Sequence, residues 1–386
     1  MACITSQVNN GKTASVAAVS YVAAGIAGAA LVMGGLSAIS AAAGGAAGSG
    51  AASSAGAGTM SPSFTEVLTT MQGFAMNGMM SVNYPDVYRS FAKNFGFSVG
   101  IIPWTAMQTT IDNFRSVTGG NLTDDNVQYL KNAALTFSDG SSSSTSKMKR
   151  DIALMIRDSI STSVNETSSS SSSNSTSSIQ ATVHGIQAYV EELSVPQANT
   201  FMTVLLIVAI IIAAIAVGVL FFKVLLETWA LFGSFPKALV GFRKHYWGTM
   251  ARTIVNLILV LYGVWVLYCI FQFTHGDSWA AKLLAGVTLA LFTGVLAGFT
   301  FVIWKTARQL KKAEGDVSGL YEDKSNWLKY SLFYDSYKKD FWWLFVPAIV
   351  YMFAKGCVLA AADGHGLTQT VAQLVIECLS KYRPWL

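Results

Sequence analysis

The chain has 386 residues, of which 52% are hydrophobic and only 12% are charged, and its formal net charge is +5. Soluble domains carry about 25% charged residues, so the composition excludes an ordinary soluble domain and favours a membrane protein. Because the basic residues lie beside the apolar runs, where they set membrane orientation, we expect membrane lipids and no nucleic acid as partners.

Two N-terminal segments are predicted to be membrane helices. Residues 17–43 form an apolar run rich in Ala and Gly, without the basic start of a secretory signal. Residues 44–59 have the composition of a flexible linker. Residues 62–82 begin well for a helix, because a serine that can cap it is followed by a proline at the first helical position. Hydropathy alone leaves open whether this second segment crosses the bilayer.

Residues 83–200 form a long polar region that contains three N-glycosylation sequons. Within it, residues 140–178 are a serine tract that cannot bury enough apolar surface to fold. Three sequons in one region favour a luminal or extracellular location. The candidate glycosylation sites are Asn121, Asn165 and Asn174. Helices are predicted near residues 104–118, 124–135 and 147–160.

The second half of the chain, residues 201–386, is predicted to be a bundle of membrane helices. Its apolar runs are residues 201–222, 254–273, 283–304 and 341–362, with a weaker one at 367–379. The fold class is therefore an all-α integral membrane protein of about seven transmembrane helices, or six if residues 62–82 do not cross.

The loops between these runs predict the orientation. Residues 223–252 and 305–340 are rich in Lys and Arg, whereas residues 158–200 contain neither. By the positive-inside rule, the two basic segments are cytosolic and the serine-rich region lies on the other side, in agreement with the sequons.

Charged residues inside apolar runs are candidate site residues, because burying one in lipid costs from about 2.5 kcal/mol upward. Lys355 lies in the 341–362 run and Glu377 in the last one, and a short turn makes these two helices antiparallel neighbours. Gln369 and Gln373 extend a polar stripe from Glu377 at helical spacing. The stripe could line a transport pathway. Alternatively, Glu377 reaches the cytosolic boundary and Lys355 is neutralised by structural contacts.

Catalytic and metal motifs are missing from the sequence. The four histidines are widely separated, no nucleophile-elbow or phosphate-loop pattern is present, and the cysteines are not spaced as a metal site. We therefore expect no enzyme activity, no metal and no cofactor.

The segment from Ser81 to Ile102 resembles a junction in fungal TRP-like membrane proteins, the family that includes the flavin carrier proteins and a polycystin-like channel. The matching residues are Tyr84, Pro85, Asn94, Phe95, Phe97, Ser98, Gly100 and Ile102, with Phe97 where the family often has Trp. Three further segments are also similar to that family: Ala2 to Thr13, Arg115 with the Thr118–Asn121 segment, and Ala198 to Met202.

The resemblance implies that residues 1–16 are the edge of a luminal, lipid-binding-like (ML-like) domain, that residues 62–82 cross, and that the chain is truncated at both ends. It also implies a calcium-linked cation channel or transporter. One alternative is a carrier of FAD or another solute into the secretory lumen, and another is a lipid-binding scaffold in membrane or cell-wall homeostasis. A homo-oligomer is possible from the sequence. The sequence does not choose between the membranes of the endoplasmic reticulum, the vacuole or Golgi, and the plasma membrane.

Overall fold

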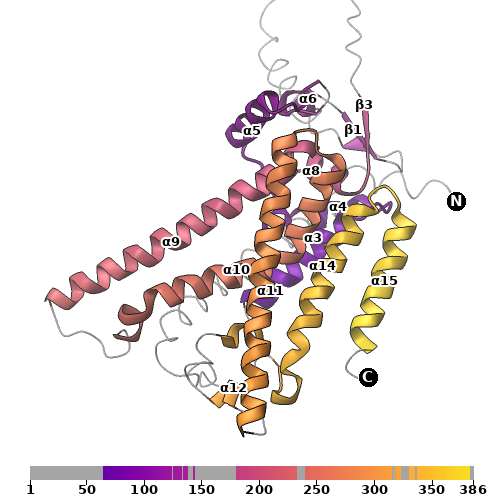
Figure 1. Cartoon of the computed structure of the whole chain (residues 1–386). Coiled ribbons are helices and arrows are strands. Elements are labelled where there is room, and N and C mark those ends of the chain that lie inside the picture. Colours follow the sequence, from indigo (N-terminus) through magenta and orange to yellow (C-terminus); the bar gives the residue numbers. More distant parts are fainter. Residues whose placement is uncertain are drawn as a thin grey trace, which may run out of the picture.

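The computed structural model is mainly helical (Figure 1). Four helices in the described part are long and apolar enough to cross a membrane, so the predicted all-α integral membrane class is confirmed. The expected ML-like edge, the helix at 17–43 and the linker after it all lie outside the described residues. The described residues are 64–123, 125–132, 134–137, 142–143, 180–232, 240–314, 317, 319–322, 330–334 and 337–382.

The four spanning helices match the four strong apolar runs of the sequence. In lipid a backbone must satisfy its own hydrogen bonds, and a continuous helix does so. All of them except the last extend well beyond the predicted run. They are α9 (Thr200–Phe232), α10 (Val240–His275), α11 (Trp279–Glu314) and α14 (Phe345–Ala361), the last preceded by the 3-10 helix η5 (Lys339–Leu344).

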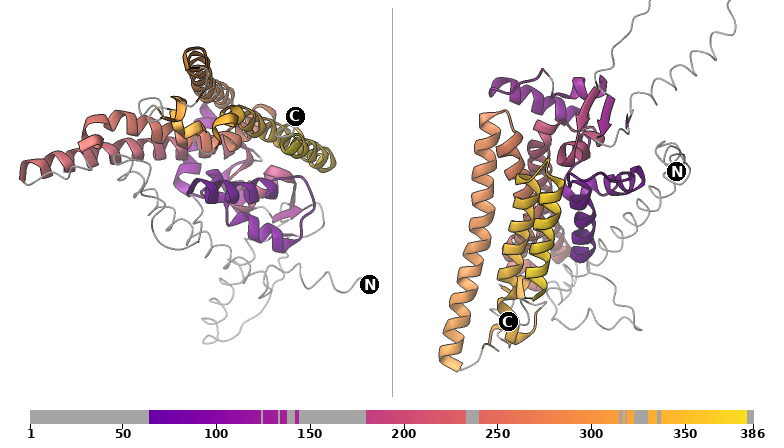
Figure 2. Two further views of the ribbon diagram at one scale, coloured as in Figure 1. Left: turned by 90° about the horizontal axis from the view of Figure 1, so that it is seen from below. Right: turned by 90° about the vertical axis from the view of Figure 1, so that its right-hand side faces the viewer.

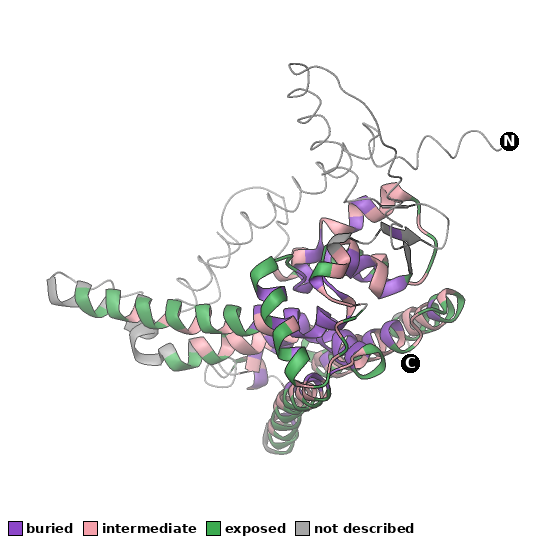
Figure 3. Cartoon of the chain, turned by 90° about the horizontal axis from the view of Figure 1, so that it is seen from above, coloured by how far each residue is buried: buried purple, intermediate pink, exposed green. Residues whose placement is uncertain are grey.

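Helix α10 is the centre of the bundle, and α9, α11 and α14 all pack against it. In its apolar window 61% of residues are buried, against 17% in α9 and in α11. Figure 3 shows this contrast as a buried centre with exposed faces along α9 and α11. The closest approach is to α14, where a Cβ on Gly356 would lie 2.7 Å from the carbonyl oxygen of Gly263. Small residues at this crossing let the two backbones meet.

Two shorter helices accompany the bundle. Helix α3 (Phe64–Gly78) has 15 residues and α15 (Gly366–Tyr382) has 17, and neither is among the four spans found in the described part. Helix α3 packs against α10 and buries Met71, Ala75 and Met76. The total of six or seven crossings stays a prediction.

The region between α3 and α9 caps one end of the bundle, and the small α12 (Gly319–Glu322) lies at the other end (Figures 1 and 2). Helix α5 confirms the helix predicted at 104–118. The helical elements are α4 (Asp86–Lys93), η1 (Gly96–Val99), α5 (Thr105–Val117), α6 (Val127–Asn132), α8 (Gly185–Glu192) and η3 (Gln197–Asn199).

This cap also contains a small sheet that the sequence did not predict. Strand β1 (Ala134–Phe137) pairs antiparallel with β2 (Ser142–Ser143) and parallel with β3 (Gln180–Val183). The helix expected at 124–135 therefore ends at Asn132, because the next residues pair with a strand more than 40 positions away. The helix predicted at 147–160 lies outside the described residues.

Candidate functional site

Lys355 and Glu377 meet at the contact between α14 and α15, as their antiparallel arrangement predicted. The Lys355 Nζ lies 3.4 Å from Glu377 Oε1. Tyr351, one helical turn before Lys355, donates its hydroxyl hydrogen to the same carboxylate oxygen, and its own oxygen lies 3.3 Å from the Lys355 ammonium. Sequence reasoning missed Tyr351, although its position four residues before Lys355 placed both on one helix face.

This three-residue contact changes the electrostatics of α14, one of the four helices that could span a membrane, and of its neighbour α15. An isolated charge in lipid is expensive, but here a cation, an anion and a phenol share one hydrogen-bonded cluster. The side chains of Lys355 and Glu377 remain 22% and 43% exposed. Glu377 therefore keeps an accessible carboxylate beside the Lys355 ammonium.

The two glutamines continue the stripe from this cluster. Gln373 donates from Nε2 to the backbone oxygen of Lys355 at 3.2 Å, and Gln369 donates to the backbone oxygen of Leu359 at 2.8 Å. Gln369 is fully buried, and its Oε1 also accepts from the backbone N–H of Ser81 at 2.7 Å. Both ends of the Gln369 amide are therefore engaged in joining α15 to neighbouring segments.

Ser81 and Asp363 form a clamp where α14 and α15 meet the cap, an end called outer because the basic segments predict that it faces away from the cytosol. The Ser81 hydroxyl donates to Asp363 Oδ1 and accepts from the backbone N–H of Gly364, both at 2.8 Å. The same carboxylate accepts the N–H of Ile186 at the start of α8, at 3.3 Å. This clamp fixes the α14–α15 turn against the segment after α3 and against α8.

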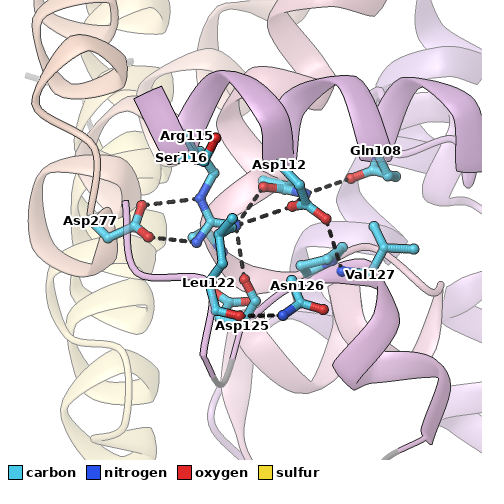
Figure 4. A network of polar contacts seen from close by, with 12 residues as sticks. Gln108, Asp112, Arg115, Ser116, Leu122, Asp125, Asn126, Val127 and Asp277 are labelled. Carbon is cyan, nitrogen blue, oxygen red and sulfur yellow. Dashed lines mark hydrogen bonds and ion pairs between the residues drawn. The ribbon is translucent and has the colours of Figure 1, made fainter. Parts of the chain in front are cut away.

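A second polar centre surrounds Arg115, which is fully buried on α5 (Figure 4). Its Nε lies 3.2 Å from Asp277 Oδ1, and its Nη2 donates to the other oxygen of that carboxylate. Its Nη1 donates to Asn199 Oδ1 at 2.8 Å and to the backbone oxygen of Asp125 at 2.9 Å. One guanidinium thus joins α5, the α10–α11 turn and the start of α9.

Helix α5 presents two more polar side chains to α9, from positions spaced at helical turns. Asn199 donates from Nδ2 to Asp112 Oδ1 at 2.7 Å and to Gln108 Oε1 at 3.2 Å. Gln108 then donates to the hydroxyl of Thr203 at 2.8 Å. The sequence already marked both sides of this contact, since the Arg115 segment and the Ala198–Met202 segment are two of those that resemble the family.

The carboxyl groups of this outer region titrate differently. Burial opposes ionisation of Asp277, but hydrogen bonds and charge from Arg115 outweigh it and lower the pKa of Asp277. Burial, with a contribution from the charge of Asp125, raises the pKa of Glu191 on α8 to about 7, although Gln187 donates a hydrogen bond to its carboxylate. Burial likewise raises the pKa of Asp125.

Of the three candidate glycosylation sites, the structure describes Asn121. Its side chain is exposed, and its Oδ1 accepts hydrogen bonds from the backbone N–H and the hydroxyl of Thr123, the third residue of the sequon. Its backbone N–H donates to Asp277 Oδ2 at 2.9 Å, so the loop that carries it is held by the Arg115 centre. Asn165 and Asn174 lie outside the described residues.

Comparison with known proteins identifies the family. A model described as "Transient receptor potential (TRP) ion channel" matches residues 19–385, and the chain belongs to this family of integral membrane proteins. This confirms the resemblance found in the sequence.

Two curated fungal proteins are similar over most of the chain. Flavin carrier protein 2 of Saccharomyces cerevisiae is 26% identical over 329 residues, which are 82% of this chain and 41% of that protein. The TRP-like ion channel protein flc1 of Cryptococcus neoformans var. grubii is 24% identical over 333 residues, which are 81% of this chain and 42% of that protein. The chain thus spans about two fifths of the length of these relatives. No solved structure gives a significant match.

Proposed function

We propose that this chain forms the membrane part of a channel or transporter for a cation, with calcium as the expected ion. The observation that carries the proposal is the Lys355–Tyr351–Glu377 cluster, in a chain whose family description is that of an ion channel. Carboxylate oxygen is the ligand type that calcium prefers, and the glutamine stripe adds amide groups along the same face.

In this proposal the Lys355 ammonium occupies the Glu377 carboxylate when no ion passes. A passing cation replaces the ammonium at the carboxylate, and Tyr351 keeps a hydrogen bond to Glu377 during the exchange. The cluster therefore sets both the sign of the ion and the energy needed to enter. Gln373 is the next pathway residue, whereas Gln369 is fully buried and its amide holds α15 against Ser81 and the α14 backbone.

The test is cation flux through the full-length protein in lipid vesicles, with Glu377→Gln as the variant. Loss of the carboxylate charge is expected to reduce flux at least tenfold. Glu227→Gln is the matched control, because Glu227 forms a partly exposed ion pair with Lys223 on α9, at 3.7 Å. Unchanged flux in a correctly inserted Glu377→Gln protein would refute the pathway role of the cluster.

The second candidate is a carrier of FAD or another solute, and the name of the Saccharomyces relative favours it. Parallel measurement of FAD uptake and cation current in the same vesicles separates the two. A protein that takes up FAD without cation current is a carrier, and the reverse result supports the channel.

A further inference from the structure

A groove of about 500 Å³ lies between α10, α11 and α14. Its walls are almost entirely apolar. Tyr262 at its base is 2% exposed, whereas Phe301 and Val350 at its mouth are 68% and 55% exposed. The hydroxyls of Tyr262 and Thr293 bond to each other at 3.1 Å, and that of Thr300 donates to the backbone oxygen of Leu296 at 2.8 Å, so all three hydroxyls of the lining are engaged within the protein. The shape and chemistry suit a hydrocarbon chain.

The groove covers the depth of one leaflet. Thr293 and Trp304 mark its two ends along α11 and are eleven residues apart, which corresponds to about 17 Å of helix. The hydrocarbon core of a bilayer is about 30 Å thick. Thr293 lies ten residues, about 15 Å, into the apolar run 283–304, so the groove begins near mid-membrane and ends on the side of the basic segments.

The rim at that end carries positive charge. The Arg308 guanidinium lies 5.3 Å from the centre of the Trp304 ring, and Trp304 in turn contacts Trp342 with ring centres 5.8 Å apart. Lys305 is exposed beside them. In the part of the chain that the structure describes, no carboxylate pairs with Arg308 or Lys305. Tryptophan and arginine at a membrane boundary place a cation at phosphate depth, and anionic lipids are attracted to such residues.

We propose that this groove binds one acyl chain of an anionic phospholipid, whose phosphate pairs with Arg308. The inference goes beyond transport and uses the orientation predicted from the basic segments, which makes this the cytosolic leaflet. A single leaflet's depth of apolar wall, ending at an unpaired guanidinium, matches one phospholipid. A phosphate at this depth supplies the anion that Arg308 lacks among the described residues.

The experiment measures the phospholipid that remains bound to the full-length protein. The protein is exchanged into vesicles of equal parts phosphatidylcholine and phosphatidylserine, extracted in mild detergent and examined by native mass spectrometry. The wild-type protein is expected to retain phosphatidylserine in preference to phosphatidylcholine. Ala297→Phe fills the groove and should remove the bound lipid, while Ala290→Phe, an exposed site two turns away on α11, should keep it.

Arg308→Gln tests the headgroup separately from the acyl chain. It is expected to keep a bound lipid but to lower the preference for phosphatidylserine about fivefold, the factor that corresponds to ~1 kcal/mol per basic residue near an anionic surface. Lys312→Gln is the control on the same helix. The proposal is overturned if the wild-type protein retains no phospholipid, if Ala297→Phe retains as much as Ala290→Phe, or if Arg308→Gln keeps the wild-type preference. If Ala297→Phe does not fold, the headgroup preference of Arg308→Gln decides.

Discussion

Arg115 of α5 contacts both oxygens of the Asp277 carboxylate in the α10–α11 turn, across a separation of 162 residues. The outer region and the membrane bundle are therefore connected by a buried, charge-assisted contact, the kind with the strongest geometric demands. The Arg115 side chain is only 1% accessible, so water cannot replace Asp277 as its partner.

Replacing Arg115 with leucine is expected to destabilise the protein by about 3–5 kcal/mol, because it leaves Asp277 and Asp112 partly buried without a cation. The measurement is the free energy of unfolding in lipid nanodiscs. The control is Lys339→Leu, which removes an exposed pair with Glu322 at 2.8 Å and should cost no more than about 1 kcal/mol. Equal losses in the two variants would show that burial of the Arg115 pair contributes nothing.

Glu191 should make the outer region less stable as pH rises from about 4.5 to about 7. Its folded pKa of about 7 exceeds the ordinary value of 4.5, so the folded state binds more protons in this window and loses stability as they leave. The full change is on the order of 3 kcal/mol, from ~1.4 kcal/mol per pKa unit. Asp277 acts in the opposite sense but only below its ordinary pKa of 3.8, outside this window.

Hydrogen exchange of α8 amides as a function of pH measures the Glu191 effect. Glu191→Gln should reduce the dependence between these pH values, and Asp125, whose pKa burial also raises, accounts for the part that remains. Glu192→Gln is the neighbouring control, because Glu192 is paired with Lys93 at 3.2 Å. A Glu191→Gln protein with the slope of the wild type would contradict the assignment.

Gly366 should not tolerate a side chain. A Cβ there would lie 2.1 Å from the backbone oxygen of Ser81, so Gly366→Ala must displace the clamp that Ser81 forms with Asp363. We expect a lower melting temperature and a weaker α14–α15 contact. Gly298→Ala on α11 has nothing within 4 Å of the new Cβ and should be neutral or slightly stabilising. Equal melting temperatures for Gly366→Ala and Gly298→Ala would contradict this prediction.

Asn121 is expected to carry an N-linked glycan when the protein is made in a fungal cell. Its exposure supports modification, as does the non-cytosolic orientation predicted for residues 83–200. Thr123→Ala should remove one glycosidase-sensitive mass increment on a gel, whereas Thr123→Ser, which preserves the sequon, should retain it. A wild-type protein whose Asn121 peptide is unmodified in mass spectrometry would refute this prediction.

The sequence predicted those parts of the fold that depend on local hydropathy. The runs at 201–222, 254–273 and 283–304 each correspond to a membrane helix. Helix α11 nevertheless continues to Glu314, because the apolar sequence ends where a helix leaves lipid but the helix can continue into water. The Lys355–Glu377 contact was also accessible, since a short turn fixes two helices as neighbours.

Contacts between distant segments were not accessible in the same way. The Ser81–Asp363 clamp joins residues 282 positions apart, and its members carry no periodic pattern. The parallel pairing of β1 with β3 depends on chain closure around the intervening serine-rich segment. Arg115 was visible as part of a motif, but its partners Asp277 and Asp112 became evident only when the helices were packed.

Helix α11 has 36 residues, which corresponds to a rod of about 54 Å. One end of this rod is held where Arg115 binds the turn before Trp279, and the rod is longer than the roughly 30 Å hydrocarbon core of a bilayer. A rod fixed at one end magnifies rotation into displacement. Tilting by about 5° around the Arg115 anchor would move the basic end by roughly 5 Å over that length. A small rearrangement around Arg115 would therefore move the basic end of α11 by a larger distance.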